Sequence, residues 1–106
     1  MAPTDTVGAA LEKMGESGVT QLPVLEDNLS VGSLRESRVL TKLLKDRELL
    51  NAPVADVMDE SFPVVEIDTN VGEIKTKLQK HPAVLIEDFK RITGIITRSD
   101  VLDLQR

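Results

Sequence analysis

A chain of 106 residues with 41% hydrophobic residues and a net charge of −5 fits one compact domain or two small halves that share a core. It has no cysteine, two aromatic residues and one histidine, which excludes disulfides and thiolate metal sites and leaves base-stacking surfaces poorly supplied. The acidic balance argues against nucleic acid and anionic membranes as partners, and no apolar run approaches the roughly 18 residues of a membrane span. No signal-peptide pattern opens the chain, so we expect a cytoplasmic protein.

The first half predicts a helix, a two-stranded hairpin and a second helix. Apolar residues at i, i+3, i+4 and i+7 indicate the first helix, which we expect to end at Gly15 and Gly18: Val7, Ala10, Leu11 and Met14. Two strands separated by a turn at 26–28 follow, at 19–25 and 30–34. The second helix is expected over 36–44, with one apolar face: Val39, Leu40, Leu43 and Leu44.

The second half repeats this order. We expect a charged connection at 45–48, a short helical turn at 54–58, an extended segment at 62–65, a helix beginning after Asp68 and Thr69, a strand at 81–86 and a turn at 87–90. Val71, Ile74 and Leu78 give this helix the same apolar spacing as the first.

The stretch 94–102 indicates a buried strand that runs directly into a helix. Ile95 and Ile96 suit a strand covered by packing, and Thr97 is the expected N-cap residue with Asp100 at capping-box spacing. Apolar helical positions follow: Val101, Leu102 and Leu104. A helix N-terminus with a hydroxyl and a carboxylate can bind an anion or a sugar, or it can simply be a capped helix whose Asp offsets the dipole.

Three landmarks of the first half recur in the second at a nearly constant offset. Val7-Gly8 corresponds to Val71-Gly72, Gly32 corresponds to Gly94, and the run 25–27 corresponds to 86–88. This internal repeat predicts two halves of about 50 residues, neither able to bury enough surface alone, which pack face to face and form two equivalent clefts.

The doubled pattern, with Gln21-Leu22-Pro23-Val24 and Gly94-Ile95-Ile96-Thr97-Arg98-Ser99-Asp100, resembles a tandem CBS-domain pair, or Bateman module, over nearly the whole chain. The resemblance implies an α+β fold in which two tandem CBS repeats of the βαββα type pack about a pseudo-twofold axis. Each repeat is a small sheet with two helices, the first at 1–50 and the second at 51–106.

Further stretches resemble the C-terminal regulatory region of a cystathionine β-synthase-type enzyme: Gly32-Ser33-Leu34, 51–58 and 62–65. The pyridoxal-phosphate catalytic part of such an enzyme is missing from the chain. The resemblance therefore implies a regulatory fragment whose partner is the catalytic domain of a pyridoxal-phosphate-dependent lyase.

The family resemblance also implies an adenosyl ligand in the cleft between the repeats, with S-adenosylmethionine as first choice and AMP, ADP or ATP as second. Asp100 would bond the ribose hydroxyls and Thr97 the ribose or its substituent. The remaining contacts implied for the ligand come from adenine-binding strand residues, the walls and one hydroxyl: Val19, Thr20, Gln21, Pro3, Ile95 and Ser99.

The second cleft departs from the family pattern. Alignment of Gly32 with Gly94 places Arg35 at the position of Thr97 and Arg38 at the position of Asp100. Without a carboxylate, ribose recognition is not expected there, and the two arginines near His81 either bind phosphates or are simply exposed. We therefore expect one competent site per chain.

Three classes of function remain in view. A ligand-sensing regulatory module, as a homodimer, is the leading hypothesis, and a ligand-independent dimerisation module is the alternative. Helix faces such as Val39/Leu43 and Val101/Leu104 can serve association, although they suit an internal core equally well. An enzyme acting alone is the weakest reading, because no nucleophile–base constellation or metal cluster can be assembled.

Overall fold

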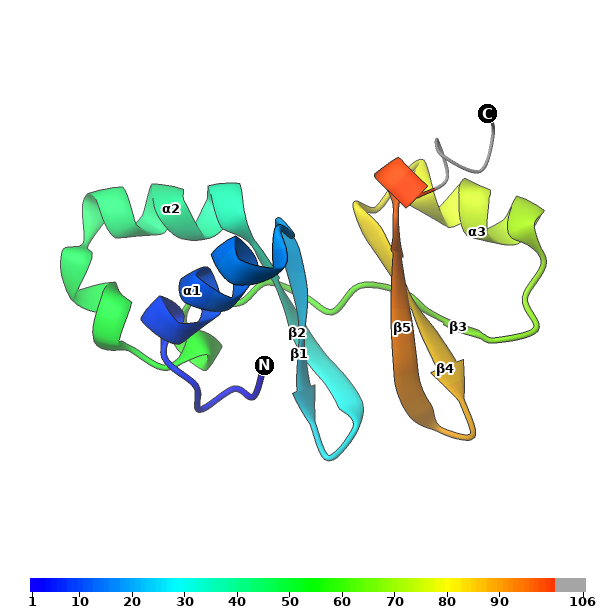
Figure 1. The fold of residues 1–106 in the computed structure, drawn as a ribbon, viewed down its shortest axis with the longest axis horizontal. Coiled ribbons are helices and arrows are strands. Elements are labelled where there is room, and N and C mark those ends of the chain that lie inside the picture. Colours follow the sequence, from blue (N-terminus) through cyan, green and yellow to red (C-terminus); the bar gives the residue numbers. More distant parts are fainter. Residues whose placement is uncertain (101–106) are drawn as a thin grey trace. The chain divides into compact units, whose positions relative to one another are not determined.

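The computed structural model describes residues 1–100 and divides into two compact units, 1–61 and 62–106 (Figure 1). Each unit combines a small sheet with helices, so the α+β fold class is confirmed. The repeat boundary predicted between residues 50 and 51 concerns the sequence repeat, and it remains a prediction.

The first unit contains a hairpin flanked by two helices, in the predicted order. Its elements are α1 (Val7–Ser17), β1 (Gln21–Glu26), β2 (Leu29–Arg35) and α2 (Glu36–Lys45), followed by two 3₁₀ turns, η1 (Arg47–Asn51) and η2 (Val54–Asp56). The strands β1 and β2 pair antiparallel. No strand precedes α1 within residues 1–100, which is a difference from the βαββα order expected of each repeat.

The core of the first unit lies between the hairpin and its helices. Its buried residues come from both helices, both strands and the segment after η1: Val7, Ala10, Met14, Val24, Leu34, Val39, Val54 and Val57. The apolar face predicted for α2 is narrower than expected, because Val39 is buried and Leu43 is half-buried whereas Leu40 and Leu44 are exposed. Positions 40 and 44 lie about 100° around the helix from 39 and 43, which turns them away from the core.

Local capping fixes the ends of α1. The Thr6 hydroxyl accepts a hydrogen bond from the Ala9 amide at 3.1 Å. Gly18 ends the helix in the left-handed region (φ 66°), and its amide donates to the Met14 carbonyl, as the sequence predicts for a C-terminal glycine. The expectation that Gly15 also ends the helix is wrong, because α1 continues through it to Ser17.

The second unit has a three-stranded sheet in the order β3-β4-β5. Its elements are β3 (Val64–Glu66), α3 (Val71–Leu78), β4 (Ala83–Asp88) and β5 (Arg91–Thr97). Strand β3 is parallel to β4, and β5 is antiparallel to it. Residues 98–100 are helical, so the predicted strand-to-helix junction is confirmed, although β5 is half-buried at Ile95 and Ile96 and not buried as predicted. Val101, Leu102 and Leu104 lie outside the described residues.

The cap of α3 differs from the prediction. Asn70, not Asp68 or Thr69, is the N-cap residue, and its side-chain oxygen accepts from the Glu73 amide at 2.8 Å. In the repeat Asn70 corresponds to Thr6, the N-cap of α1, so the repeat alignment identifies the cap better than local residue preference does. Asn is as good an N-cap as Asp, which is why the local pattern was ambiguous.

The two hairpins share an irregularity that demonstrates the internal repeat. In the first unit the pairing shifts between Val24, opposite Gly32, and the next residue of β1. In the second unit it shifts between Ile86, opposite Gly94, and the next residue of β4. The two glycines are the landmarks aligned in the sequence, so the sequence repeat corresponds to equivalent backbone geometry.

Candidate ligand site

The strongest sequence candidate, the pair Thr97 and Asp100, is brought together by the end of β5. The Asp100 Oδ2 atom accepts from the Thr97 amide at 2.8 Å and from the Thr97 hydroxyl at 3.2 Å. This contact is one half of a capping box, in which a carboxylate in the first turn reaches back to the N-cap residue. The capping reading of the sequence is therefore confirmed in its geometry.

The same geometry leaves one carboxylate oxygen of Asp100 available to a ligand. Among residues 1–100, no hydrogen bond involves the Asp100 Oδ1 atom, and Asp100 and Ser99 are both exposed. A carboxylate oxygen held in place by its partner oxygen is a preorganised acceptor for hydroxyl groups. Ile95, on the strand that leads to this helix start, is half-buried beside Leu85 and supplies an apolar neighbour.

The side chain of Arg98, next to this helix start, bonds to another part of the second unit. The Arg98 Nε atom donates to the Leu78 carbonyl at 2.7 Å, at the C-terminal end of α3. A positive charge at a helix C-terminus interacts favourably with the helix dipole. This anchor occupies part of the guanidinium that a phosphate near Asp100 would use.

The strand residues predicted to hold adenine lie at the entrance of β1. The Val19 amide donates to the Met14 carbonyl at 3.1 Å, directly after the left-handed Gly18, and this turn directs the chain into the strand. The Thr20 carbonyl accepts from the Glu36 amide at 2.9 Å, and Gln21 pairs with Arg35. The structure thus brings 19–21 next to the start of α2, and their approach to Thr97 and Asp100 remains a prediction.

Pro3, predicted as a wall of the site, lies in the lead-in to α1. Its carbonyl accepts from the Ala55 amide at 3.0 Å, and the side chain is half-buried. Pro3 therefore belongs to the contact between the lead-in and η2, and its role as a wall of a ligand site remains a prediction.

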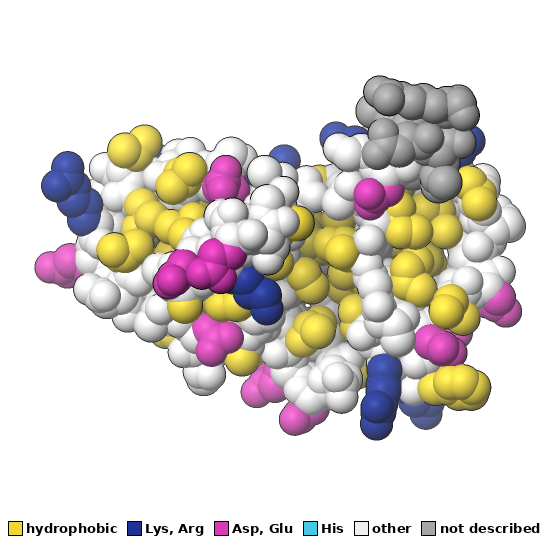
Figure 2. All heavy atoms as spheres, in the orientation of Figure 1, with side chains coloured by type: hydrophobic (Ala, Val, Ile, Leu, Met, Phe, Trp, Pro, Cys, Tyr) yellow, Lys and Arg dark blue, Asp and Glu magenta, His cyan; other side chains and the backbone are white. Residues whose placement is uncertain are grey.

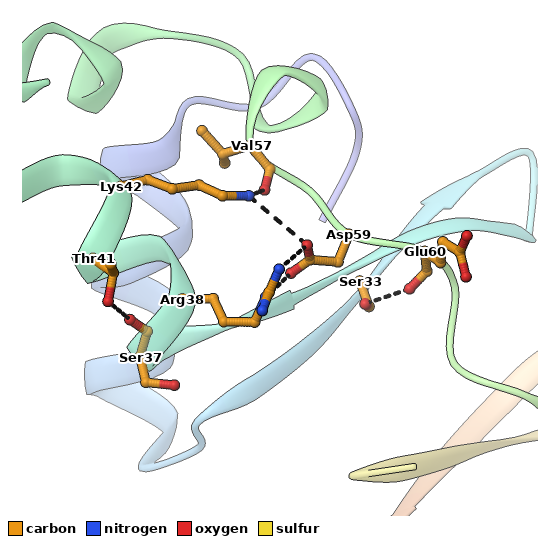
Figure 3. Close-up of polar contacts among 8 residues, drawn as sticks. All are labelled: Ser33, Ser37, Arg38, Thr41, Lys42, Val57, Asp59 and Glu60. Carbon is orange, nitrogen blue, oxygen red and sulfur yellow. Dashed lines mark hydrogen bonds and ion pairs between the residues drawn. The ribbon is translucent and has the colours of Figure 1, made fainter. Parts of the chain in front are cut away.

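Arg38, one of the two arginines of the second predicted cleft, forms an ion pair that the sequence did not predict. Arg38 Nε and Nη2 donate to Asp59 Oδ2 and Oδ1 at 2.7 and 3.0 Å, and Lys42 Nζ donates to the Val57 carbonyl at 2.6 Å (Figure 3). Half of the Arg38 side chain is exposed (51%). Within residues 1–100, Arg35 and His81 are exposed and have no side-chain hydrogen bond.

The charge of Asp59 is stabilised by its surroundings. The hydrogen bond from Arg38 lowers the pKa of the Asp59 carboxyl below its ordinary value, partial burial opposes this shift, and the charge of Lys42 adds to the lowering. Asp59 also pairs through its backbone with Ser33 on β2. No sequence spacing marks Asp59, because all of these partners lie in distant parts of the chain.

Two features, a metal-binding cluster and a membrane-spanning helix, are absent from residues 1–100. They contain no cluster of three or more His, Asp or Glu side chains arranged to hold a metal ion. Within the same range, none of the helices has the length and the apolar composition needed to cross a membrane.

Comparison with known proteins identifies the family. The family model described as the CBS domain matches residues 1–45 and again 54–106. The chain belongs to the CBS-domain family. It is a CBS-domain pair, a regulatory module with two tandem CBS repeats in an α+β fold, and such pairs bind adenosine-containing effectors and associate with catalytic domains.

Solved structures and a curated relative agree with this assignment. A CBS-pair protein from Arabidopsis thaliana is 28% identical with a TM-score of 0.82, over 99% of this chain and 83% of that one. A CBS-domain-containing protein from Agrobacterium tumefaciens is 15% identical with a TM-score of 0.85, over 100% and 82%. An inosine-5′-monophosphate dehydrogenase from Rhodopirellula baltica is 26% identical over 98% of this chain, which spans 19% of that protein.

Proposed function

We propose that this CBS pair senses an adenosyl compound, with S-adenosylmethionine as the first choice and AMP, ADP or ATP as the second. The observation that carries the proposal is the helix start at Thr97, where Asp100 is fixed through one carboxylate oxygen and exposes the other. A cis-diol such as that of ribose suits this acceptor. On the family resemblance, we expect the strand entrance at 19–21 to supply backbone groups and the apolar Val19 for adenine.

Charge supports the less anionic ligand. The nearest cation along the chain, Arg98, already donates through Nε to the carbonyl of Leu78. The chain carries 18 acidic and 13 basic residues, which disfavours a triphosphate. S-adenosylmethionine carries no phosphate and a positive sulfonium, so it avoids this repulsion.

The ligand would act by preferring one arrangement of the two repeats, and the attached catalytic domain would respond to that preference. A cystathionine β-synthase-type lyase is our first candidate for that domain, on the resemblance of 51–58 and 62–65. The match to an inosine-5′-monophosphate dehydrogenase supports a second candidate, an enzyme of that type. The cytoplasm is the compartment we propose for either.

Titration calorimetry on the whole chain with the four ligands tests the proposal. Asp100→Asn keeps an oxygen for the Thr97 cap but removes the charge, and Asp100→Ala removes both. Loss of a charged acceptor should weaken binding about ten- to a hundredfold. The matched control is Asp27→Asn at the tip of the first hairpin, which has φ 52° and tolerates Asn, so it should bind as the wild type does.

The alternative is a module that dimerises without a ligand. Val39 and Leu43 pack in the first unit's core, so an association face on α2 would use the exposed Leu40 and Leu44 instead. Sedimentation with and without ligand separates the two functions. A dimer that forms in the absence of ligand, together with no binding of any of the four compounds, would favour the alternative.

A further inference from the structure

The segment 52–60, which precedes β3, completes the first unit by covering an apolar surface. Val54 and Val57 are buried in the core of that unit. Met58 lies over Gly32 so closely that a Cβ at residue 32 would come within 2.5 Å of the Met58 sulfur. A side chain at residue 32 would therefore force Met58 to move.

Backbone hydrogen bonds hold the same segment at both ends. The Val7 amide, at the start of α1, donates to the Ala52 carbonyl at 3.0 Å. Near the other end, the Ser33 amide donates to the Asp59 carbonyl at 3.0 Å, and the Asp59 amide donates back to the Ser33 carbonyl at 2.9 Å. The segment thus pairs with the free edge of β2.

The equivalent surface of the second unit has no such cover among the described residues. Val7 is 1% exposed, whereas Val71, its repeat equivalent, is 54% exposed. Among residues 1–100, a Cβ built on Gly94 would meet only the Ile86 Cβ, at 4.0 Å, whereas a Cβ at Gly32 would meet Met58. Figure 2 shows hydrophobic side chains exposed beside β5 of this unit.

At the outer edge of β5, the backbone groups of Ile95 have no partner within residues 1–100. Ile95 lies opposite Leu85, whose amide donates to Pro63 on the far side of β4. This pair is therefore a non-hydrogen-bonded pair, and the amide and carbonyl of Ile95 point away from β4. Ser33 has the same register in the first unit, and its two groups bond to Asp59.

We propose that this surface, formed by Val71, Gly94, Ile95 and Ile96 and here called the Gly94 surface, binds an extended peptide segment with the chemistry of 52–60. An apolar side chain of the segment would lie over Gly94, and its backbone would pair with Ile95 as an added strand. A carbonyl of the segment would accept from the Val71 amide.

Charge specifies the segment further. In the first unit Arg38 pairs with Asp59, and the repeat equivalent of Arg38 is Asp100. The residue of the segment at the position of Asp59 would therefore face a carboxylate, so it is a lysine or arginine. This occupant is a polypeptide, and because its basic residue would face the same Asp100 carboxylate as the ribose, it would compete with the adenosyl ligand proposed above.

Nuclear magnetic resonance on the ¹⁵N-labelled whole chain tests the inference, without nucleotide. The probe is a synthetic peptide with the sequence of residues 51–61 carrying Asp59→Lys. It should shift the amides of Val71, Gly94 and Ile95, and the same peptide with Asp59 retained should bind more weakly.

Variants of the chain make the test specific. Gly94→Leu fills the space over β5 and should weaken binding about tenfold or more, with Gly94→Ala as a milder variant should Gly94→Leu disturb folding. The matched control is Gly15→Leu on α1, where a Cβ would meet no atom of residues 1–100 within 4 Å. The inference would be overturned by shifts confined to the surroundings of Gly32 or by no shifts at millimolar peptide. It would also be overturned if both Gly94 variants bound the peptide as tightly as the wild type does.

Discussion

Replacing Gly32 or Gly94 by alanine tests whether these two equivalent positions of the repeats have different surroundings. Both glycines have φ values that L-residues adopt, so the comparison isolates steric contact. At Gly32 the new Cβ would lie 2.5 Å from Met58 Sδ, 2.9 Å from Met58 Cγ and 3.1 Å from the Asp59 carbonyl oxygen. At Gly94 it would lie 4.0 Å from Ile86 Cβ, an ordinary contact distance.

These distances predict opposite signs for the two substitutions. Overpacking costs about 1–3 kcal/mol, and replacing glycine by alanine returns about 0.4–1 kcal/mol through the unfolded chain. Gly32→Ala should therefore lower the free energy of unfolding by roughly 0.5–2 kcal/mol, and Gly94→Ala should raise it by about 0.4–1 kcal/mol. For a chain of this size, the first loss corresponds to a Tm lower by about 2–9 °C.

Chemical and thermal denaturation of the two variants measure these changes. Because Met58 is the main obstacle at Gly32, the cost of Gly32→Ala should shrink when Met58→Ala is already present. Equal effects of the two glycine substitutions would refute the reasoning. A cost at Gly32 that Met58→Ala leaves unchanged would refute the assignment to Met58.

Three further predictions concern charge, turn and cap. Because Arg38 lowers the pKa of Asp59 in the fold, Asp59 contributes its full stabilisation above its unfolded pKa of about 3.9 and loses it as the pH falls through the lowered pKa. Denaturation at pH 2–6 should therefore show that the stability of Asp59→Asn depends less on pH than that of the wild type. An unchanged pH dependence would contradict the ion pair. Phe89 is 91% exposed at φ 50° in the second hairpin, so Phe89→Asn should raise stability by about 0.5–1 kcal/mol in urea melts, whereas a loss would show that the ring is packed. Thr6→Ala should cost about 0.5–2 kcal/mol by the same assay, with Thr4→Ala as the exposed control.

Local pattern was sufficient to predict the α-helices and strands of both repeats, but not the 3₁₀ turn η1. Apolar spacing located α1 and α3, and alternating runs located the strands, because helix and strand periods are properties of neighbouring residues. The pairing of Thr97 with Asp100 was predictable for the same reason, since both lie within one helical turn. Local preference failed where several residues were equivalent choices, as at Asp68, Thr69 and Asn70 before α3.

Contacts between distant residues were not predictable from the sequence. Gly32 was recognised as a repeat landmark, but its physical reason is Met58, which belongs to a much later segment of the chain. Arg38 was considered a phosphate ligand or an exposed residue, and its bond to Asp59 joins positions 21 apart. Such contacts depend on how the segment 52–60 folds back, and no residue spacing encodes that path.

Because the segment 52–60 packs on the first unit, the sequence repeat and the compact structural unit end at different residues. A truncation after residue 50, at the boundary suggested by the repeat, would remove Val54 and Val57 from the first core and expose Val7 to water. One sequence repeat is thus not by itself a structurally complete unit. Fragments of the first repeat made for expression, or shuffled in evolution, should keep their core only when the break comes after Ser61.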